Sequence, residues 1–188
     1  MKLYEYLQED LDLSELHRDF GKALKQVFSE EYLNKIQSVI KRNIVIKEKD
    51  FKNPSKAAYV EGRTIFVNKP VFDRLSSKER VKYLMHEFIH IMQNTKNFFV
   101  VRAFEEVYDL GDELYKIVKR NLKGSIGEFL TGAKNKISSP KYEIISYLMN
   151  GDIDWTQLTM DGKREFIIAL NNSKMFRLNT VFWKERLL

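Results

Sequence analysis

Apolar residues in the first part of the chain recur with the period of an α-helix. Between residues 3 and 40 they return every three or four positions, for example at Leu13, Leu16, Phe20 and Leu24. This spacing places the apolar side chains on one face of a helix, where a core can bury them. We therefore expect two or three helices in this part of the chain.

Three short runs rich in β-branched residues follow. They cover residues 44–46, 57–60 and 64–67, and Gly62 lies between the last two runs. Glycine readily adopts the positive φ angle that a tight hairpin turn requires. The sequence thus predicts a β-hairpin and one further strand, which together make a small sheet.

The chain then returns to helical spacing. Ser76 and Glu79 form a capping-box pattern, in which the two side chains bond to free N–H groups at a helix start. This pattern predicts a helix over residues 77–94. A second helix is expected over residues 100–121, with Gly111 as a weak point inside it.

Glycine and proline mark the limits of the next segments. Residues 122–139 contain three glycines, and we expect them to form a long loop or a lid. Ser139 and Pro140 favour the start of a new helix, because serine caps well and proline suits the first helical position. Asn150 and Gly151 favour its end.

These patterns predict one α+β domain over residues 1–188, since a chain of 188 residues suits one compact domain better than two. Two further helical patterns occur near its end, over residues 166–170 and 175–183. The domain divides into a helical N-terminal part, a central part with the strands and a candidate metal site, and C-terminal helices. These parts cover residues 1–42, 43–150 and 151–188.

Composition and charge limit the possible functions. The chain has no cysteine, so any metal must bind to nitrogen or oxygen ligands. Its net charge of +6 would allow contact with nucleic acid. The basic residues are scattered and alternate with acids, as over residues 47–50, so the sequence does not favour nucleic-acid binding.

The sequence also lacks the patterns of membrane insertion and export. No window reaches the roughly 18 consecutive apolar residues of a membrane span. Acidic residues interrupt the apolar positions of residues 1–10, which is not typical of a signal peptide. We expect a cytoplasmic protein that does not enter the membrane.

Residues 86–90 read His-Glu-Phe-Ile-His and carry the clearest chemical signal in the chain. On a helix, positions i and i+4 share a face, so His86 and His90 can direct two imidazole nitrogens at one ion. Glu87 lies beside them and can accept a proton from a water molecule there. The residues around this stripe are apolar, which suits a buried metal site.

Two histidines do not complete a metal site. The only other histidine is His17, far upstream, and residue 96 is a lysine at the spacing where metzincins have a third histidine. A carboxylate is therefore favoured as the third ligand, as in the His/His/Glu sites of catalytic zinc.

Several carboxylates compete for this role. Glu105, together with Asp109, has the Glu-x-x-x-Asp spacing of thermolysin-like enzymes, but it follows the motif closely, and Glu106 beside it is an alternative. Glu143 lies in the first turn of the helix expected after residue 139 and shares a face with Tyr147. We favour Glu143.

The order of these features resembles the gluzincin group of the zincin metallopeptidases, especially its small bacterial and bacteriophage forms. The shared features are a strand hairpin, a capped helix with His-Glu-x-x-His followed by Gln93, and a later helix that opens Pro-x-x-Glu-x-x-Ser-Tyr at Pro140. The resemblance covers residues 44–150.

The resemblance implies a zincin-like fold and a specific site. His86, His90 and Glu143 would bind one Zn²⁺, and Glu87 would be the general base. The protein would then be a zinc metallopeptidase that hydrolyses peptide bonds in a protein or peptide substrate. The alternative is a non-catalytic binding or structural protein, phage-associated or not, that keeps the zincin fold and its zinc.

One position departs from the family pattern. Many gluzincins have an acidic residue four positions after the glutamate ligand, where it orients a histidine, and here this position is Tyr147. The group that orients the histidines must therefore lie elsewhere or differ in kind. Tyr147 or Tyr142 could instead donate a hydrogen bond to the oxyanion of hydrolysis. The resemblance also implies that an extended substrate adds a strand to an exposed sheet edge, which we expect at residues 64–68.

Overall fold

The computed structural model describes residues 14–43, 45–94, 101–131 and 140–187. Within these ranges the chain combines a three-stranded sheet with a mostly helical remainder, so the prediction of an α+β fold is confirmed. None of the described helices is long and apolar enough to cross a membrane.

Two helices open the described chain, α1 (Ser14–Val27) and α2 (Glu30–Asn43), as the apolar spacing predicts. Residues 1–13 lie outside the described ranges. The rings of Phe20 and Phe28 meet the ring of Phe88 edge to face, with centroids 5.8 and 6.1 Å apart. These contacts pack α1, and Phe28 directly after it, against the helix that carries the His-Glu-x-x-His motif.

The sheet consists of β1 (Val45–Glu48), β2 (Ala58–Glu61) and β3 (Thr64–Val67). β2 and β3 are antiparallel, and Gly62 has a φ angle of 62° in the turn between them, so the predicted hairpin is confirmed. β1 pairs with β3 in parallel, which gives the strand order β1-β3-β2.

This order corrects the expected substrate edge. Residues 64–68 were expected to form the exposed edge, but β3 is the central strand and pairs on both sides. The prediction was wrong because the hairpin is a local feature, whereas the parallel pairing of β1 depends on a crossover that the sequence does not reveal. Among the described strands, β1 and β2 are the edges, and β2 packs against the motif helix.

The motif helix, α4 (Ser77–Asn94), matches the predicted bounds. Its capping box is present, because the Glu79 carboxylate accepts a hydrogen bond from the backbone N–H of Ser76 at 2.8 Å and the Ser76 hydroxyl accepts one from the backbone N–H of Glu79 at 3.4 Å. A single short helix, α3 (Lys69–Phe72), precedes it. The buried apolar residues of α4 are Leu84, Met85, Phe88, Ile89, Ile91 and Met92.

The next two long helices are α5 (Val101–Asn121) and α7 (Pro140–Asn150). They approach closely at Gly111, where an added Cβ would lie 2.7 Å from the backbone oxygen of Lys141. The predicted weak point of α5 is therefore a contact point for α7. Close approach of two helix backbones requires a residue without a side chain.

The end of α7 has the hydrogen bonds of a Schellman motif. The N–H of Asp152 donates to the carbonyl of Tyr147, and that of Gly151 donates to the carbonyl of Leu148. Gly151 has a φ angle of 78°, which glycine adopts without strain. The helix stop predicted at Asn150 and Gly151 is confirmed.

The loop expected over residues 122–139 is corrected in its first half. Residues 126–129 form α6 (Ile126–Phe129), which has its own capping box between Ser125 and Glu128. Phe129 and Leu130 are fully buried, so this segment is part of the core and not a lid. The signature Ser-x-x-Glu was present in the sequence, but the neighbouring glycines concealed it. Residues 132–139 lie outside the described ranges.

The chain continues with η2 (Trp155–Gln157), α8 (Met160–Asn172) and α9 (Val181–Leu187). The helical pattern expected over residues 175–183 is only partly correct, because 175–180 are not helical. Met175 and Phe176 are buried there without helical structure. Phe176 instead forms an isolated β-bridge with Phe28.

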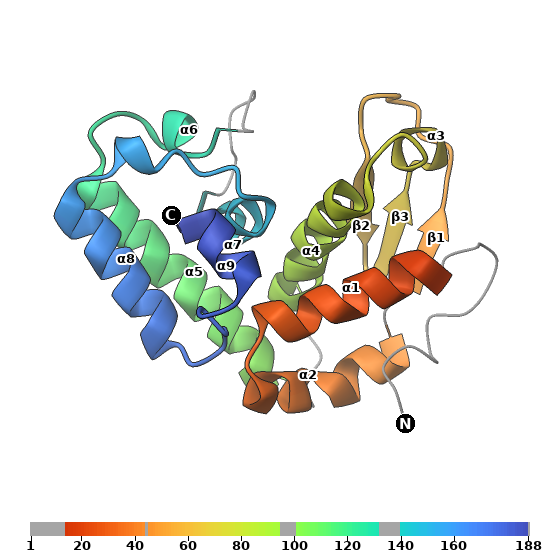
Figure 1. Ribbon diagram of the computed structural model, residues 1–188, viewed down its shortest axis with the longest axis horizontal. Coiled ribbons are helices and arrows are strands. Elements are labelled where there is room, and N and C mark those ends of the chain that lie inside the picture. Colours follow the sequence, from red (N-terminus) through yellow and green to blue (C-terminus); the bar gives the residue numbers. More distant parts are fainter. Residues whose placement is uncertain (1–13, 44, 95–100, 132–139, 188) are drawn as a thin grey trace.

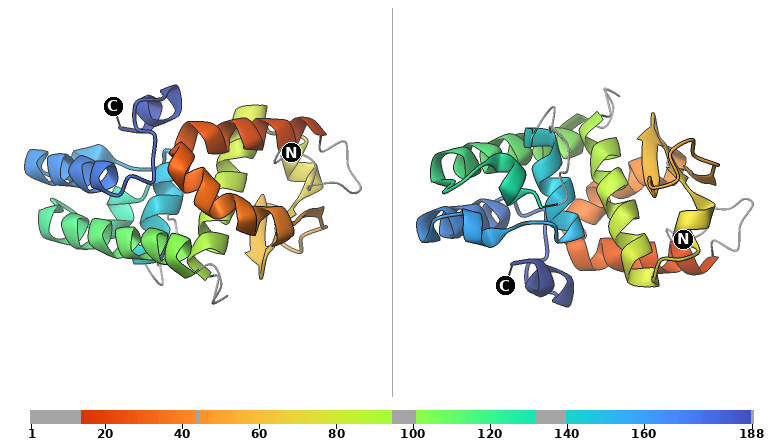
Figure 2. Two further views of the ribbon diagram at one scale, coloured as in Figure 1. Left: turned by 90° about the horizontal axis from the view of Figure 1, so that it is seen from below. Right: turned by 90° about the horizontal axis from the view of Figure 1, so that it is seen from above.

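Two helices from distant parts of the chain meet in the middle of the molecule. Figures 1 and 2 show α4 between the sheet and α7, with α5 and α8 beyond α7. α4 packs against α7, α1 and β2, while α7 also packs against α5. The α4–α7 contact brings the His-Glu-x-x-His motif to the helix that carries Glu143.

Candidate metal centre

Polar side chains form one stripe on each of the two central helices. On α4 the stripe is His86, His90 and Gln93, whose spacing of four and three residues keeps them on one face. On α7 it contains Glu143 and Asn150, two turns apart on one face. The two helices pack against each other and both histidines lie close to Glu143, so the two stripes face each other in the interface.

Three ligand atoms converge where the stripes meet. His86 Nε2 and His90 Nε2 are 3.1 Å apart, and Glu143 Oε2 lies 3.8 Å from the first and 3.5 Å from the second. A circle through three points at these separations has a radius of about 2.0 Å. That radius equals the roughly 2.0–2.2 Å bonds that nitrogen and oxygen ligands make to zinc. The three residues could therefore hold a metal ion.

The protonation of the two histidines differs. Burial lowers the pKa of His86 to about 4, and the nearby His90 acts in the same direction. Burial also disfavours protonation of His90, but its hydrogen bond and charge interaction with Glu143 outweigh this, and its pKa is raised. The pair thus takes up one proton easily and resists a second.

Glu143 is ionised beside the histidines. Burial would raise the pKa of its carboxyl, but the hydrogen bond from His90 and the charges of His90 and His86 lower it overall. Its side chain is 29% exposed, whereas those of His86 and His90 are each 18% exposed. The carboxylate therefore lies at the mouth of the group, with the imidazoles deeper.

Glu87 lies beside this group and next to the edge strand. Burial raises the pKa of its carboxyl. The charges of His90 and Lys56, together with a hydrogen bond from the backbone of Val60 in β2, oppose this rise. The structure thus brings Glu87, the motif histidines and strand β2 together. A carboxyl with a raised pKa is suited to accept a proton near neutral pH.

Tyr147 and Tyr142 were the two tyrosines expected as possible hydrogen-bond donors, and the structure describes the side chain of Tyr147 only. The ring of Tyr147 lies edge-on to that of His86, with centroids 5.7 Å apart, so it borders the group. Burial and the charge of Glu143 raise the pKa of its phenol, which keeps the hydroxyl protonated and able to donate. Tyr142 lies in the first turn of α7, and its side chain is outside the described part of the structure.

The alternative third ligands do not reach the group. Glu105 is exposed on α5, and Glu106 pairs with Lys35 Nζ at 3.3 Å. Neither belongs to the set of described residues that could share one ion with His86 and His90. The prediction of Glu143 as the third ligand agrees with this group of three residues.

Two neighbours of the histidines were not foreseen as site residues. Gln93 Oε1 lies 3.3 Å from Nδ1 of His90, and Asn150 Nδ2 lies 3.2 Å from Nδ1 of His86. The sequence held one signal for Asn150, which is that it follows Glu143 by two helical turns. Its position at a helix end suggested only a stop signal.

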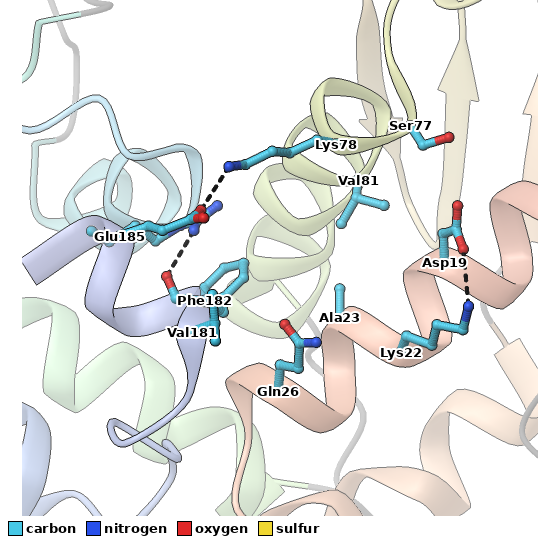
Figure 3. Close-up of a pocket in the computed structure, with 11 residues that line it drawn as sticks. Asp19, Lys22, Ala23, Gln26, Ser77, Lys78, Val81, Val181, Phe182 and Glu185 are labelled. Atoms are coloured by element: carbon cyan, nitrogen blue, oxygen red, sulfur yellow. Dashed lines mark hydrogen bonds and ion pairs between the residues drawn. The ribbon is translucent and has the colours of Figure 1, made fainter.

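A separate pocket of about 320 Å³ lies between α1, the start of α4 and α9 (Figure 3). The charged groups at its rim pair with one another, as Lys78 does with Glu185 at 2.7 Å and Lys22 with Asp19 at 3.6 Å. Its lining includes Ala23 and Phe182 but none of the residues of the His/His/Glu group. We interpret this pocket as a gap in the packing of α9 against α1 and α4.

Comparison of the chain with protein-family models, with curated proteins and with solved structures found no match. The resemblance to gluzincins therefore depends on the motif residues quoted above.

Proposed function

We propose that the protein is a zinc-dependent hydrolase of peptide bonds, with His86, His90 and Glu143 as the zinc ligands. The observation that carries the proposal is the triangle of two imidazole nitrogens and one carboxylate oxygen, with Glu87 next to it. Its size suits zinc, and two histidines with one glutamate form a ligand set of catalytic zinc. Three protein ligands leave one of zinc's four positions for water or substrate.

The residues around the triangle can divide the work of hydrolysis. When bound, zinc would supply a Lewis acid that lowers the pKa of water and polarises the scissile carbonyl. Glu87 would accept a proton from the attacking water and then donate it to the leaving amine nitrogen. The Tyr147 hydroxyl would donate a hydrogen bond to the carbonyl oxygen as negative charge develops on it.

The edge strand offers a binding surface for an extended substrate. β2 pairs on one side with β3, and no described strand pairs with its other side. It packs against α4 next to Glu87, whose carboxylate bonds to the backbone of Val60. A peptide that adds a strand to β2 would lie beside the general base, which favours a protein or peptide as substrate.

The proposal is tested by metal content and proteolysis in matched variants. We expect the purified wild type to contain one zinc per chain and to cleave an unfolded generic substrate such as labelled casein. Glu87→Gln should retain the zinc but lose cleavage by roughly 100-fold or more, because it removes the proton acceptor and not a ligand. Glu143→Ala should lose most of the zinc.

Glu105→Ala is the matched control, because Glu105 is an exposed glutamate outside the group and should keep both zinc and activity. If the wild type binds zinc but cleaves no better than Glu87→Gln, the protein is a non-catalytic zinc-binding protein, and the hydrolase proposal fails. Two histidines and a carboxylate also suit iron in oxygenases, so iron in place of zinc would overturn the proposal as a whole.

A further inference from the structure

The buried polar atoms without a partner cluster around the two histidines. Three side-chain atoms among the described residues are buried without a hydrogen bond, and they are Gln93 Nε2, Ser146 Oγ and Asn150 Oδ1. All three residues lie on the facing stripes of α4 and α7. Buried polar atoms in native proteins are nearly always paired, so such a cluster needs a physical explanation.

The ligand geometry determines where the histidine protons must be. Both imidazoles present Nε2 to Glu143, so a metal would bind at Nε2 and the proton would remain on Nδ1. A histidine that ligates a metal usually donates this second N–H to an oxygen, which fixes its tautomer and its ring orientation. Each histidine therefore requires an acceptor next to Nδ1.

Gln93 supplies the acceptor for His90. Its Oε1 lies 3.3 Å from Nδ1, so the Nδ1–H can donate to it. Gln93 is one helical turn from His90 on the same face of α4, which holds the amide against the ring.

Asn150 lies next to Nδ1 of His86 in the same way, but it presents its amide nitrogen to the ring and not its amide oxygen. Its Nδ2 lies 3.2 Å from Nδ1 of His86, while its Oδ1 is buried without a partner. An amide N–H cannot donate to a ring nitrogen that itself carries a proton. Half a turn about the Cβ–Cγ bond of Asn150 removes this conflict and pairs Oδ1.

We propose that Asn150 and Gln93 are positioning residues that hold His86 and His90 as Nδ1–H tautomers, with Asn150 Oδ1 as the acceptor for His86. They take the part that an acidic residue at position 147 would have in a gluzincin. This inference rests on the metal site of the proposed function, although not on the hydrolysis.

Neutral amides give the site a different charge from that of a carboxylate partner. An amide oxygen accepts a hydrogen bond without adding negative charge, whereas a carboxylate forms a stronger, charge-assisted bond. The histidines should therefore be weaker donors of electron density to the metal than those oriented by aspartate. Asn150→Asp should consequently bind zinc at least as tightly as the wild type.

The first test measures zinc affinity by competition with a chromophoric chelator. Asn150→Leu keeps the approximate size of the side chain but has no acceptor, so its dissociation constant should rise by roughly 10- to 100-fold, and Gln93→Leu should behave alike. Asn150→Asp should restore wild-type or tighter binding, which a purely structural role of the amide would not explain. Asn172→Leu, which also replaces the last residue of a helix, is the matched control and should bind zinc normally.

The second test needs no metal. Long-range ¹H–¹⁵N correlations of the metal-free protein report which nitrogen of each histidine carries the proton. We expect Nδ1–H for His86 and His90 in the wild type, and a mixture of tautomers for His86 in Asn150→Leu. An Nε2–H tautomer of His86 in the wild type would overturn the inference, as would zinc binding by Asn150→Leu within twofold of the wild type. If the wild type binds no zinc, the proposed metal site fails, whichever tautomer is found.

Discussion

The two motif histidines share one easily gained proton, and this sets the pH dependence of metal binding. Zinc requires both imidazoles to be neutral, so it must displace any proton that they hold. The raised pKa of His90 means that it holds this proton more firmly than a free imidazole does, whereas burial lowers the pKa of His86 to about 4. The pair should therefore release one proton, not two, when zinc binds in mildly acidic solution.

We expect the zinc dissociation constant to increase about tenfold for each unit by which the pH falls from about 6.5 to 5. Isothermal titration of zinc in buffers of different ionisation enthalpy measures the protons released. The release of two protons per zinc in this window would show that the two histidines titrate independently, contrary to their contact. His90→Ala should lose the pH dependence in this window together with most of the affinity.

The role of the Tyr147 hydroxyl can be tested without changing the metal ligands. Tyr147→Phe keeps the ring against His86 but removes the hydroxyl, so zinc content should not change. If the hydroxyl stabilises the oxyanion, kcat should fall by roughly 100-fold with little change in KM. Steady-state kinetics on a fluorogenic peptide measure both constants. An unchanged kcat would leave Tyr147 as a packing residue.

The sequence predicts the residues of the metal centre unevenly. His86 and His90 could be paired from the sequence, because helical spacing alone puts them on one face. The choice of Glu143 over Glu105 depends on which helix packs against α4, and no local pattern contains that information. Asn150 was missed for the same reason, because only the packing of α7 turns a helix-end residue towards His86.

At the scale of elements, the place of α7 depends on a glycine in α5. Gly111→Ala should raise helix propensity by about 1 kcal/mol, but the new Cβ would lie 2.7 Å from the backbone oxygen of Lys141. Overpacking of this kind costs about 1–3 kcal/mol, so we expect a net loss of stability and weaker zinc binding. Urea denaturation and zinc titration measure the two effects.

Gly127→Ala is the control for this substitution. Gly127 lies in α6, where an added Cβ would approach only Ser125 Oγ, at 3.9 Å. It should leave zinc binding unchanged and stabilise the protein by less than about 1 kcal/mol. A gain in stability from Gly111→Ala would mean that α5 and α7 can separate without cost.

The other end of α7 is held by α9. Arg186 is buried, and its Nε donates to the carbonyl of Met149 at 2.7 Å, beside Asn150. Its Nη1 donates to the carbonyl of Phe182 at 2.8 Å. An arginine that bonds to the last carbonyls of a helix complements the partial negative charge there. α9 thus fixes the end of the helix that presents Asn150.

Arg186→Met keeps the aliphatic stem but removes these hydrogen bonds, so the free energy of unfolding should fall by about 2–4 kcal/mol. Zinc affinity should also fall, because the end of α7 loses a fixed partner. Lys184→Met in the same helix replaces an exposed base and should change stability by less than about 0.5 kcal/mol. Equal effects of the two substitutions on chemical denaturation would contradict the capping role.

Elements with strong local signals were predicted well, and those that depend on tertiary pairing were not. The capping box at Ser76 fixed the start of α4, and Gly151 fixed the end of α7, because both act within a few residues. The central position of β3 depends on β1, and the burial of α6 in the core depends on other parts of the chain, although α6 itself has a local capping box. The expected sheet edge and the expected lid were wrong for this physical reason.

On the scale of the whole molecule, metal binding should stabilise the fold. The ligands come from α4 and α7, and their interface joins the part with the sheet to the part with α5 and α8 (Figure 1). Zinc that binds only the folded chain adds about 2.7 kcal/mol at a free concentration of 100 times its dissociation constant. We expect zinc to raise the midpoint of thermal unfolding and a chelator to reverse the shift.

Magnesium at the same concentration should leave this midpoint unchanged, because it prefers oxygen ligands in octahedral geometry. The double variant His86→Ala and His90→Ala should not respond to zinc. A zinc-dependent rise that persists in this variant would place the stabilising ion elsewhere on the molecule.

The hydrogen bond between Arg186 and the Met149 carbonyl at the end of α7 also affects when the metal site is completed during synthesis. Ribosomes make the chain from its N-terminus, so the histidines and Glu143 emerge well before α9. Until α9 has docked, the Met149 carbonyl lacks its partner and the turn that carries Asn150 is less firmly held. We expect a chain still on the ribosome to bind metal more weakly than the finished protein. Under the proposed function, this weaker metal site would keep the chain inactive while it is still unfolded and open to cleavage.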